Sequence, residues 1–323
     1  MRLFLVELTR FRSRRAIVLM LVAAALLTAV VAATTIWDTR PITAEDRAAA
    51  QAQVDQMAQE PWAKKEIARC EKNPERYSGD GATAEDCRQM FVPAPEDLVY
   101  RETLSLGRAM EGPGMGVLVI VAALMTIVGT TFAGGDWASG SMSNQLLFEP
   151  RRLKLWLAKA AAVFVGAVVV SAVLVSAFWV TLYVVAESRG IATGATVQEQ
   201  IRWFAGRGVL LSGLVAVGAY ALTMLLRHTV GTLAVLFAYV VGGEILIQSL
   251  PIEGSLRWSL AHNAAAWIQD GYKYWDSTIT CSPMGECDQE AFLSLTHGAT
   301  YLGVLLAVAV VLSVAFFRRR DIP

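Results

Sequence analysis

The residues best suited to bind a partner or do chemistry lie in one polar segment, from Gly134 to Arg152, between two long apolar runs. The segment carries an acid near its start, Asp136, and closes on Pro150, Arg151 and Arg152. These residue types favour binding over catalysis. We expect the segment to fold at a membrane surface and to contact something in the cytoplasm.

Recognised catalytic motifs are absent from the sequence. It contains no G-x-x-x-x-G-K-[ST] phosphate loop, no G-x-S-x-G and no H-E-x-x-H. His262 and His297 are too isolated to propose as ligands, and His228 beside Arg227 is expected in a cytoplasmic turn. We therefore expect a protein that is not an enzyme and that holds no metal or cofactor of its own.

The elements that must position this segment are membrane helices. The chain is 55% hydrophobic and only 17% charged, and apolar residues gather in runs of about 20, the length that crosses about 30 Å of hydrocarbon. The sequence predicts an all-α membrane protein with six transmembrane helices, at residues 16–37, 112–133, 160–186, 208–226, 229–250 and 298–317. The first run is longer than the apolar core of a signal peptide, so we expect it to be retained.

The distribution of charge predicts the orientation of these helices. Residues 1–15, 134–159, 227–228 and 318–323 together hold 13 Lys/Arg against 4 Asp/Glu, whereas the opposite side holds 15 Lys/Arg and 23 Asp/Glu. The positive-inside rule then places both termini in the cytoplasm. The formal net charge of zero conceals this asymmetry, and we expect membrane lipid, not nucleic acid, as a partner.

All four cysteines fall in segments predicted to lie outside. Cys70 and Cys87 share residues 38–111, and Cys281 and Cys287 share residues 251–297. Cysteines confined to the oxidising side predict two disulfides. Pairing within each segment is the simplest arrangement, and crossed pairings that join the two segments stay open. Zinc binding is disfavoured because there is no C-x-x-C.

Three connecting segments are predicted on the outer side. Residues 38–111 predict a small helical extracytoplasmic cap, with Thr43 capping a first helix and Pro61 separating it from a second at 62–71. Residues 187–207 predict a loop. Residues 251–297 predict a re-entrant or loop region with a helix at 255–269 and many aromatic side chains, which are typical of an interfacial belt.

The N-terminal segment, residues 1–15, mixes apolar residues with arginines. This mixture predicts a short amphipathic helix that lies in the cytoplasmic interface. The alternative is a charged segment that serves only to set topology.

With this layout in place, residues 134–159 resemble one family. The order is an acid and an aromatic, then Gly-Ser, then Gln-Leu-Leu-Phe, a proline, two arginines and a lysine in the next helix. It is similar to the cytoplasmic connector of the permease subunits of bacterial ABC-2-type exporters, as is the layout of nearly the whole chain. Two residues depart from the family pattern: Asp136 stands where Glu is commoner, and Ser141 where Thr is commoner.

The resemblance implies that this connector is a coupling helix that docks onto a separate ATPase subunit, which would carry the ATP and Mg²⁺. The implied contact residues are Asp136, Trp137, Gly140, Ser141, Gln145, Leu146, Leu147 and Phe148, with Arg151 and Arg152 orienting the helix on the membrane. It further implies two ATPase copies, a second permease that makes a homodimer, a bacterial cytoplasmic membrane, and export of an amphiphile such as a drug, antibiotic peptide or lipid.

Glu244 is a second candidate, because it is the one charge inside the six predicted spans. Ionisable groups at this depth face protein or a water-filled cavity, and Gly242 and Gly243 beside it permit close helix approach or local unwinding. One interpretation is a polar contact on the translocation path, or a hinge. The other is a structural hydrogen bond to a neighbouring helix.

Two other functions stay open from the sequence. One is a membrane sensor or scaffold that does not transport and whose cap binds a ligand. The other is a secondary transporter, which is disfavoured because Glu244 stands alone and no inverted repeat is visible.

Overall fold

The computed structural model describes residues 2–79, 83–276, 278–279 and 289–319. It forms two compact units, one made of Met1–Ala33 with Leu106–Pro323, the other of Thr34–Ser105. The predicted Cys281–Cys287 disulfide lies outside the described residues.

Six helices in the described part of the chain are long and apolar enough to cross a membrane, which makes this a helical multi-pass membrane protein. Their bounds are Arg15–Asp38, Leu106–Ala138, Arg152–Ser188, Ala195–Leu226, Thr229–Ser249 and Leu295–Arg319. Five of the six predicted spans fall within them, and the predicted span 229–250 ends one residue beyond Ser249.

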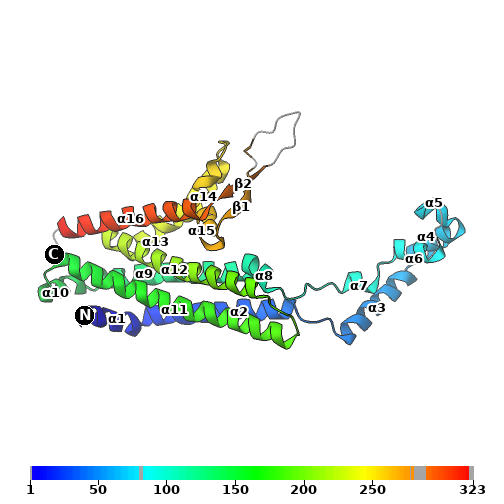
Figure 1. The fold of residues 1–323 in the computed structure, drawn as a ribbon, viewed down its shortest axis with the longest axis horizontal. Helices are drawn as coiled ribbons and strands as arrows, with labels where there is room; N and C mark the ends of the chain where they lie inside the picture. Colours follow the sequence, from blue (N-terminus) through cyan, green and yellow to red (C-terminus); the bar gives the residue numbers. More distant parts are fainter. Residues whose placement is uncertain (1, 80–82, 277, 280–288, 320–323) are drawn as a thin grey trace. The chain divides into compact units, whose positions relative to one another are not determined.

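The first unit is a helical bundle (Figure 1). Its elements are α1 (Arg2–Ser13), α2 (Arg15–Asp38), α8 (Leu106–Ala109), η1 (Met110–Gly114), α9 (Met115–Ala138), α10 (Ser141–Phe148), α11 (Arg152–Ser188), α12 (Ala195–Leu226), α13 (Thr229–Phe237), η2 (Ala238–Gly242), α14 (Gly243–Ser249), η3 (Ser255–Trp258), α15 (Leu260–Gln269), β1 (Tyr272–Trp275), β2 (Glu290–Leu293) and α16 (Leu295–Arg319). Helix α2 runs on into the second unit. Figure 1 shows α1, α10 and the end of α16 together at one end of the bundle.

Close packing of α9 on α12 forms the centre of the bundle. A methyl group added at Gly129 of α9 would collide with the carbonyl oxygen of Ala216, and one at Gly208 of α12 would collide with Leu118. Small residues at these positions let the two backbones approach, as is common between membrane helices.

Several helices extend beyond the spans predicted for them. The predicted loop at 187–207 is mostly helix, because α11 runs to Ser188 and α12 already begins at Ala195. With 37 residues, α11 is about 55 Å long, well beyond the hydrocarbon thickness. Residues 134–138, predicted to leave the second span, are the last turn of α9.

The fold is not purely α-helical. Strands β1 and β2 pair antiparallel, with Tyr272 opposite Leu293 and Trp275 opposite Glu290. The hairpin packs through Tyr274 and Leu293 against Ala266 of α15. The aromatic residues predicted as an interfacial belt thus partly form a small hydrophobic core.

The second unit contains α3 (Ala44–Gln59), α4 (Pro61–Lys72), α5 (Pro74–Ser78), α6 (Ala84–Phe91) and α7 (Pro95–Leu98). Thr43 caps α3 as predicted, in a reciprocal pair of hydrogen bonds with Asp46. Pro61 is the first residue of α4, where its missing N–H costs no helical hydrogen bond. The predicted Cys70–Cys87 disulfide is present and joins α4 to α6.

Candidate functional site

The polar segment between the second and third spans folds into helix α10. Gly140 adopts a left-handed conformation, with φ of 66°, which favours glycine and turns the chain from α9 into α10. The helix ends at Phe148, two residues before Pro150, which cannot continue a helix. Although Asp136 is a residue type that favours the N-terminal end of a helix, it does not begin α10 but lies in the last turn of α9.

Asp136 instead lies at the centre of a buried ion network. Its carboxylate accepts hydrogen bonds from Arg14 beside α1 and from Lys159 of α11. Lys159 also donates to Glu7 of α1, with 2.9 Å between Nζ and Oε2. Only 1% of Asp136, 1% of Glu7 and none of Lys159 is exposed. Two buried anions are therefore matched by Lys159 and the partly buried Arg14, as isolated buried charges would not be tolerated.

Aromatic side chains enclose this network. The Arg14 guanidinium lies 4.9 Å and the Lys159 ammonium 5.2 Å from the ring centre of Phe132. The Phe11 ring packs on Phe132 at 5.8 Å and occupies the space at Gly166, where any side chain would collide with it. Helix α1 is thus fixed to α11 and α9 by both charge and packing.

The network reaches α10 through Ser141. The Ser141 hydroxyl donates to Asp136, with 2.9 Å between Oγ and Oδ1, and Gln145 donates in turn to Ser141 at 3.3 Å. Met142 is buried. The first turn of α10 is therefore held against α9, and through Asp136 against α1 and α11.

Trp137 and Arg152 link the same region to neighbouring spans. Arg227 lies 4.6 Å from the Trp137 ring centre, and Trp137 meets Phe317 of α16 edge-on at 6.4 Å. Arg152 donates to the carbonyls of Phe317 and Arg318. Both side chains are half-buried, so their contacts lie largely within this chain.

The far end of α10 faces outward. Leu147 is 81% exposed and Phe148 is 90% exposed, while Leu146 and Gln145 are half-buried and Gly140 is exposed. Of the residues predicted to meet a partner, Leu147 and Phe148 have the most exposed side chains. Nothing in the described part of the chain covers them.

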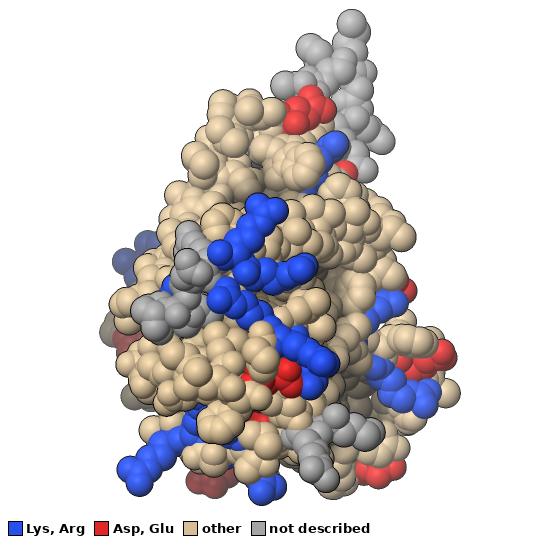
Figure 2. All heavy atoms as spheres, turned by 90° about the vertical axis from the view of Figure 1, so that its left-hand side faces the viewer, with Lys and Arg blue, Asp and Glu red and all other residues tan. Residues whose placement is uncertain are grey.

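The face around α10 is basic (Figure 2). Arg151, Lys154, Arg318 and Arg319 are exposed at this end of the bundle. Lys154 donates to Glu149 and holds the pKa of that carboxyl below its ordinary value. The exposed apolar pair is thus bordered by cations, which suits an anionic lipid surface or an acidic partner.

The second predicted site, around Glu244, forms a different kind of contact. Its carboxylate accepts hydrogen bonds from the Ser259 hydroxyl at 2.8 Å and from the Ala261 N–H at 2.9 Å. Both donors belong to the start of α15, so Glu244 ties α14 to the N-terminus of α15, where an acid is favoured by the helix dipole. This geometry favours the structural interpretation of Glu244. Gly242 ends the π-helical turn η2, and Gly243 begins α14.

Sequence reasoning missed three members of the ion network: Glu7, Arg14 and Lys159. Each was counted only as a charge of a cytoplasmic segment. The available signal was Lys159 itself, the last charge before a long apolar run, since a lysine at that depth requires an anionic partner. Glu7, the one acid of residues 1–15, was the matching candidate.

Comparison with known proteins adds no relative: no protein-family model matches the chain, and neither a curated protein nor a solved structure is significantly similar to it.

Proposed function

We propose that this chain is the permease subunit of an ATP-driven exporter of the ABC-2 type, with α10 as the docking element for a separate ATPase. The observation that carries the proposal is the pair Leu147 and Phe148, 81% and 90% exposed on a helix whose other end is held by buried ions. Large apolar side chains exposed together mark interaction sites.

The way α10 is held supports a mechanical role. A partner that moves α10 also moves Ser141 and Asp136, and through Lys159 it moves α11 and α1. Packed helices and buried ion pairs transmit such displacements as rigid-body motion. A loop that only linked two spans would need neither the buried network nor the exposed pair.

The rest of the proposal follows from the resemblance of the connector and the layout to this family. Six spans form half of a translocation path, so the working complex contains two permeases, as a homodimer, and two ATPases. The complex lies in a bacterial cytoplasmic membrane with both termini and α10 in the cytoplasm. The substrate is an amphiphile that leaves the inner leaflet.

The test is co-purification of an ATPase from native membranes with tagged chain. We expect Leu147→Asp with Phe148→Asp to weaken this association by about 30-fold or more, the effect of losing an interface hot spot. The matched control is Tyr100→Asp in the second unit, a side chain that is 77% exposed but does not belong to α10. If the double variant retains the ATPase, the assignment of α10 as the docking element is contradicted.

A second measurement tests whether the captured partner supplies the ATP hydrolysis. The purified complex should hydrolyse ATP, and the free chain should not. If the chain purifies without an ATPase in every membrane preparation, a sensor or a secondary transporter becomes the better explanation.

A further inference from the structure

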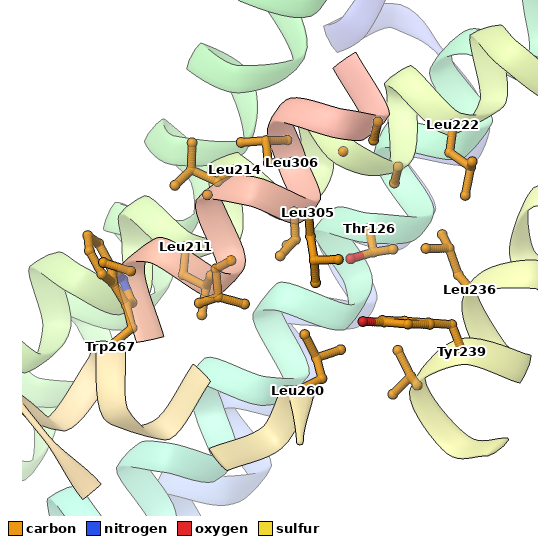
Figure 3. Close-up of a pocket in the computed structure, with 18 residues that line it drawn as sticks. Thr126, Leu211, Leu214, Leu222, Leu236, Tyr239, Leu260, Trp267, Leu305 and Leu306 are labelled. Carbon is orange, nitrogen blue, oxygen red and sulfur yellow. The ribbon is translucent and has the colours of Figure 1, made fainter. Parts of the chain in front are cut away.

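A cavity of about 330 Å³ lies in the membrane part of the first unit, away from the ion network. Five elements surround it: α9, α12, α13 with η2, α15 and α16 (Figure 3). Its volume falls in the lower part of the range for small-molecule sites. Its lining is almost entirely apolar, mainly leucine, alanine and glycine, and no charged residue takes part.

The few polar groups of the lining are already engaged. Thr126 donates to the carbonyl of Ala122 at 2.8 Å, and the Trp267 indole donates to the carbonyl of Arg207 at 3.0 Å. The Tyr239 hydroxyl, which points among the lining residues in Figure 3, is 3.0 Å from that of Tyr301. Water needs two or more polar partners to occupy a cavity, so this one favours hydrocarbon.

The cavity is open toward the outside of the bundle. Three of its lining residues are exposed, Tyr239 and Val240 of η2 and Gly303 of α16. A side chain added at Gly303 would meet nothing within 4 Å, so glycine leaves this edge open. In a membrane the opening faces the hydrocarbon region, because both helices belong to candidate spans.

One wall of the cavity is irregular. Tyr239 and Val240 belong to η2, a π-helical turn inside the fifth candidate span. Such turns inside membrane helices are rare and occur frequently at functional sites. Here both residues of the turn line the cavity, and both are also exposed at its edge. The Tyr301 hydroxyl, which contacts that of Tyr239, donates to the carbonyl of Trp258 at 2.9 Å, so polar groups lie beside the exposed Tyr239.

From this geometry we propose that the cavity binds one alkyl chain of a single-chain amphiphile, which enters from the bilayer between η2 and α16. The alkyl chain contacts the leucines of four helices, and the head group of the amphiphile stays near the Tyr239–Tyr301 pair. The assignment of this cavity as the substrate site of an exporter rests on the proposed function, but the binding of an alkyl chain in the cavity does not.

The experiment uses the purified full-length chain in lipid nanodiscs, without an ATPase, so it does not depend on transport. Trp267 lines the cavity and reports on it. Because the chain has nine tryptophans, the Trp267 signal is taken as the fluorescence difference between the wild type and Trp267→Phe. The probe is 11,12-dibromostearate, whose bromine atoms quench tryptophan, titrated into discs of ordinary phosphatidylcholine.

We expect saturable quenching of Trp267. Gly303→Leu, which adds a side chain at the edge of the cavity, should weaken the apparent affinity by about tenfold. Gly116→Leu is the matched control, because it also adds leucine to a membrane helix in open space but does not line the cavity. Quenching that is linear in probe and equal in all three proteins would overturn the proposal.

A second arm distinguishes the free amphiphile from a bilayer lipid and does not require a variant. In discs of dibrominated phosphatidylcholine, unbrominated stearate should relieve Trp267 quenching if a single chain displaces lipid from the cavity. If stearate leaves the quenching unchanged, the cavity at Trp267 holds either a phospholipid chain or no chain. Either result would contradict the proposal. If no ATPase is captured but Trp267 quenching behaves as expected, the proposed exporter function is rejected and the proposed alkyl-chain site is retained.

Discussion

The hydroxyl of Ser141, the first residue of α10, donates a 2.9 Å hydrogen bond to Asp136 in the last turn of α9. The same carboxylate is bound by Arg14 and Lys159. An acid at the C-terminal end of a helix opposes the helix dipole, so its presence there requires these two cations. One buried side chain of α9 thus joins α10 to α11 and to Arg14, which lies between α1 and α2.

Removal of Lys159 should unfold this region. Lys159→Met leaves Glu7 and Asp136 buried without their shared cation, so we expect a loss of about 3–5 kcal/mol in stability. Thermal unfolding in detergent measures the effect. Lys154→Met is the control, since Lys154 pairs with Glu149 at an exposed position and should cost less than about 1 kcal/mol. Equal losses in the two variants would show that the buried network adds no stability.

The Asp136–Ser141 contact should matter for coupling more than for docking. Ser141→Ala removes the hydrogen bond to α9 but leaves Leu147 and Phe148 in place. If the proposed function holds, the variant should bind the ATPase normally while transport per ATP hydrolysed falls several-fold. Ser139→Ala is the control, since Ser139 bonds only within its own helix turn, to the carbonyl of Gly135. Loss of ATPase binding in Ser141→Ala would assign this contact to docking instead.

The packing of α9 on α12 predicts a strong effect of a single methyl group. Gly129→Ala places a Cβ against the carbonyl of Ala216, and backbone atoms cannot move aside as a side chain can. We expect a loss of about 1–3 kcal/mol. Gly116→Ala, in the same helix but in open space, should be neutral or stabilising, because alanine favours helix. Chemical unfolding of both variants in one detergent provides the comparison.

The spans could be predicted because each depends on a local property, a run of about 20 apolar residues. The capping of α3 by Thr43 and the Cys70–Cys87 disulfide are also short-range features, and both are present. Helix ends in membrane proteins are harder to predict. The second span was predicted to end at residue 133, yet α9 continues to Ala138, and Gly134 lets Thr229 of α13 approach.

The ion network could not be predicted in the same way. Its members come from residues 7, 14, 136 and 159, and each alone is an ordinary charge beside an apolar run. Only tertiary packing brings them within hydrogen-bond distance. The hairpin of β1 and β2 escaped prediction for a related reason: each strand has four residues, too few to show an alternating pattern.

The second unit should respond to acid through Asp46. Arg101 makes two hydrogen bonds of 2.9 Å to Asp46, and Thr43 donates to the same carboxylate, so the pKa of Asp46 is well below its ordinary value. A carboxyl whose pKa is lower in the folded state contributes stability above its unfolded pKa of about 4, and this contribution is lost as pH falls further.

Asp46→Asn lacks that contribution at every pH, so the wild type should exceed it in stability at pH 6 and approach it as pH falls from about 4 toward 2. Hydrogen exchange of the α3 amides in the full-length protein measures the stability of the wild type and of the variant at each pH. Asp86→Asn is the parallel control, because Thr83 alone lowers the pKa of Asp86, without an arginine, so its difference from the wild type should be smaller. If the difference between wild type and Asp46→Asn stays constant over this range, the Asp46–Arg101 pair does not contribute through the charge of the carboxylate.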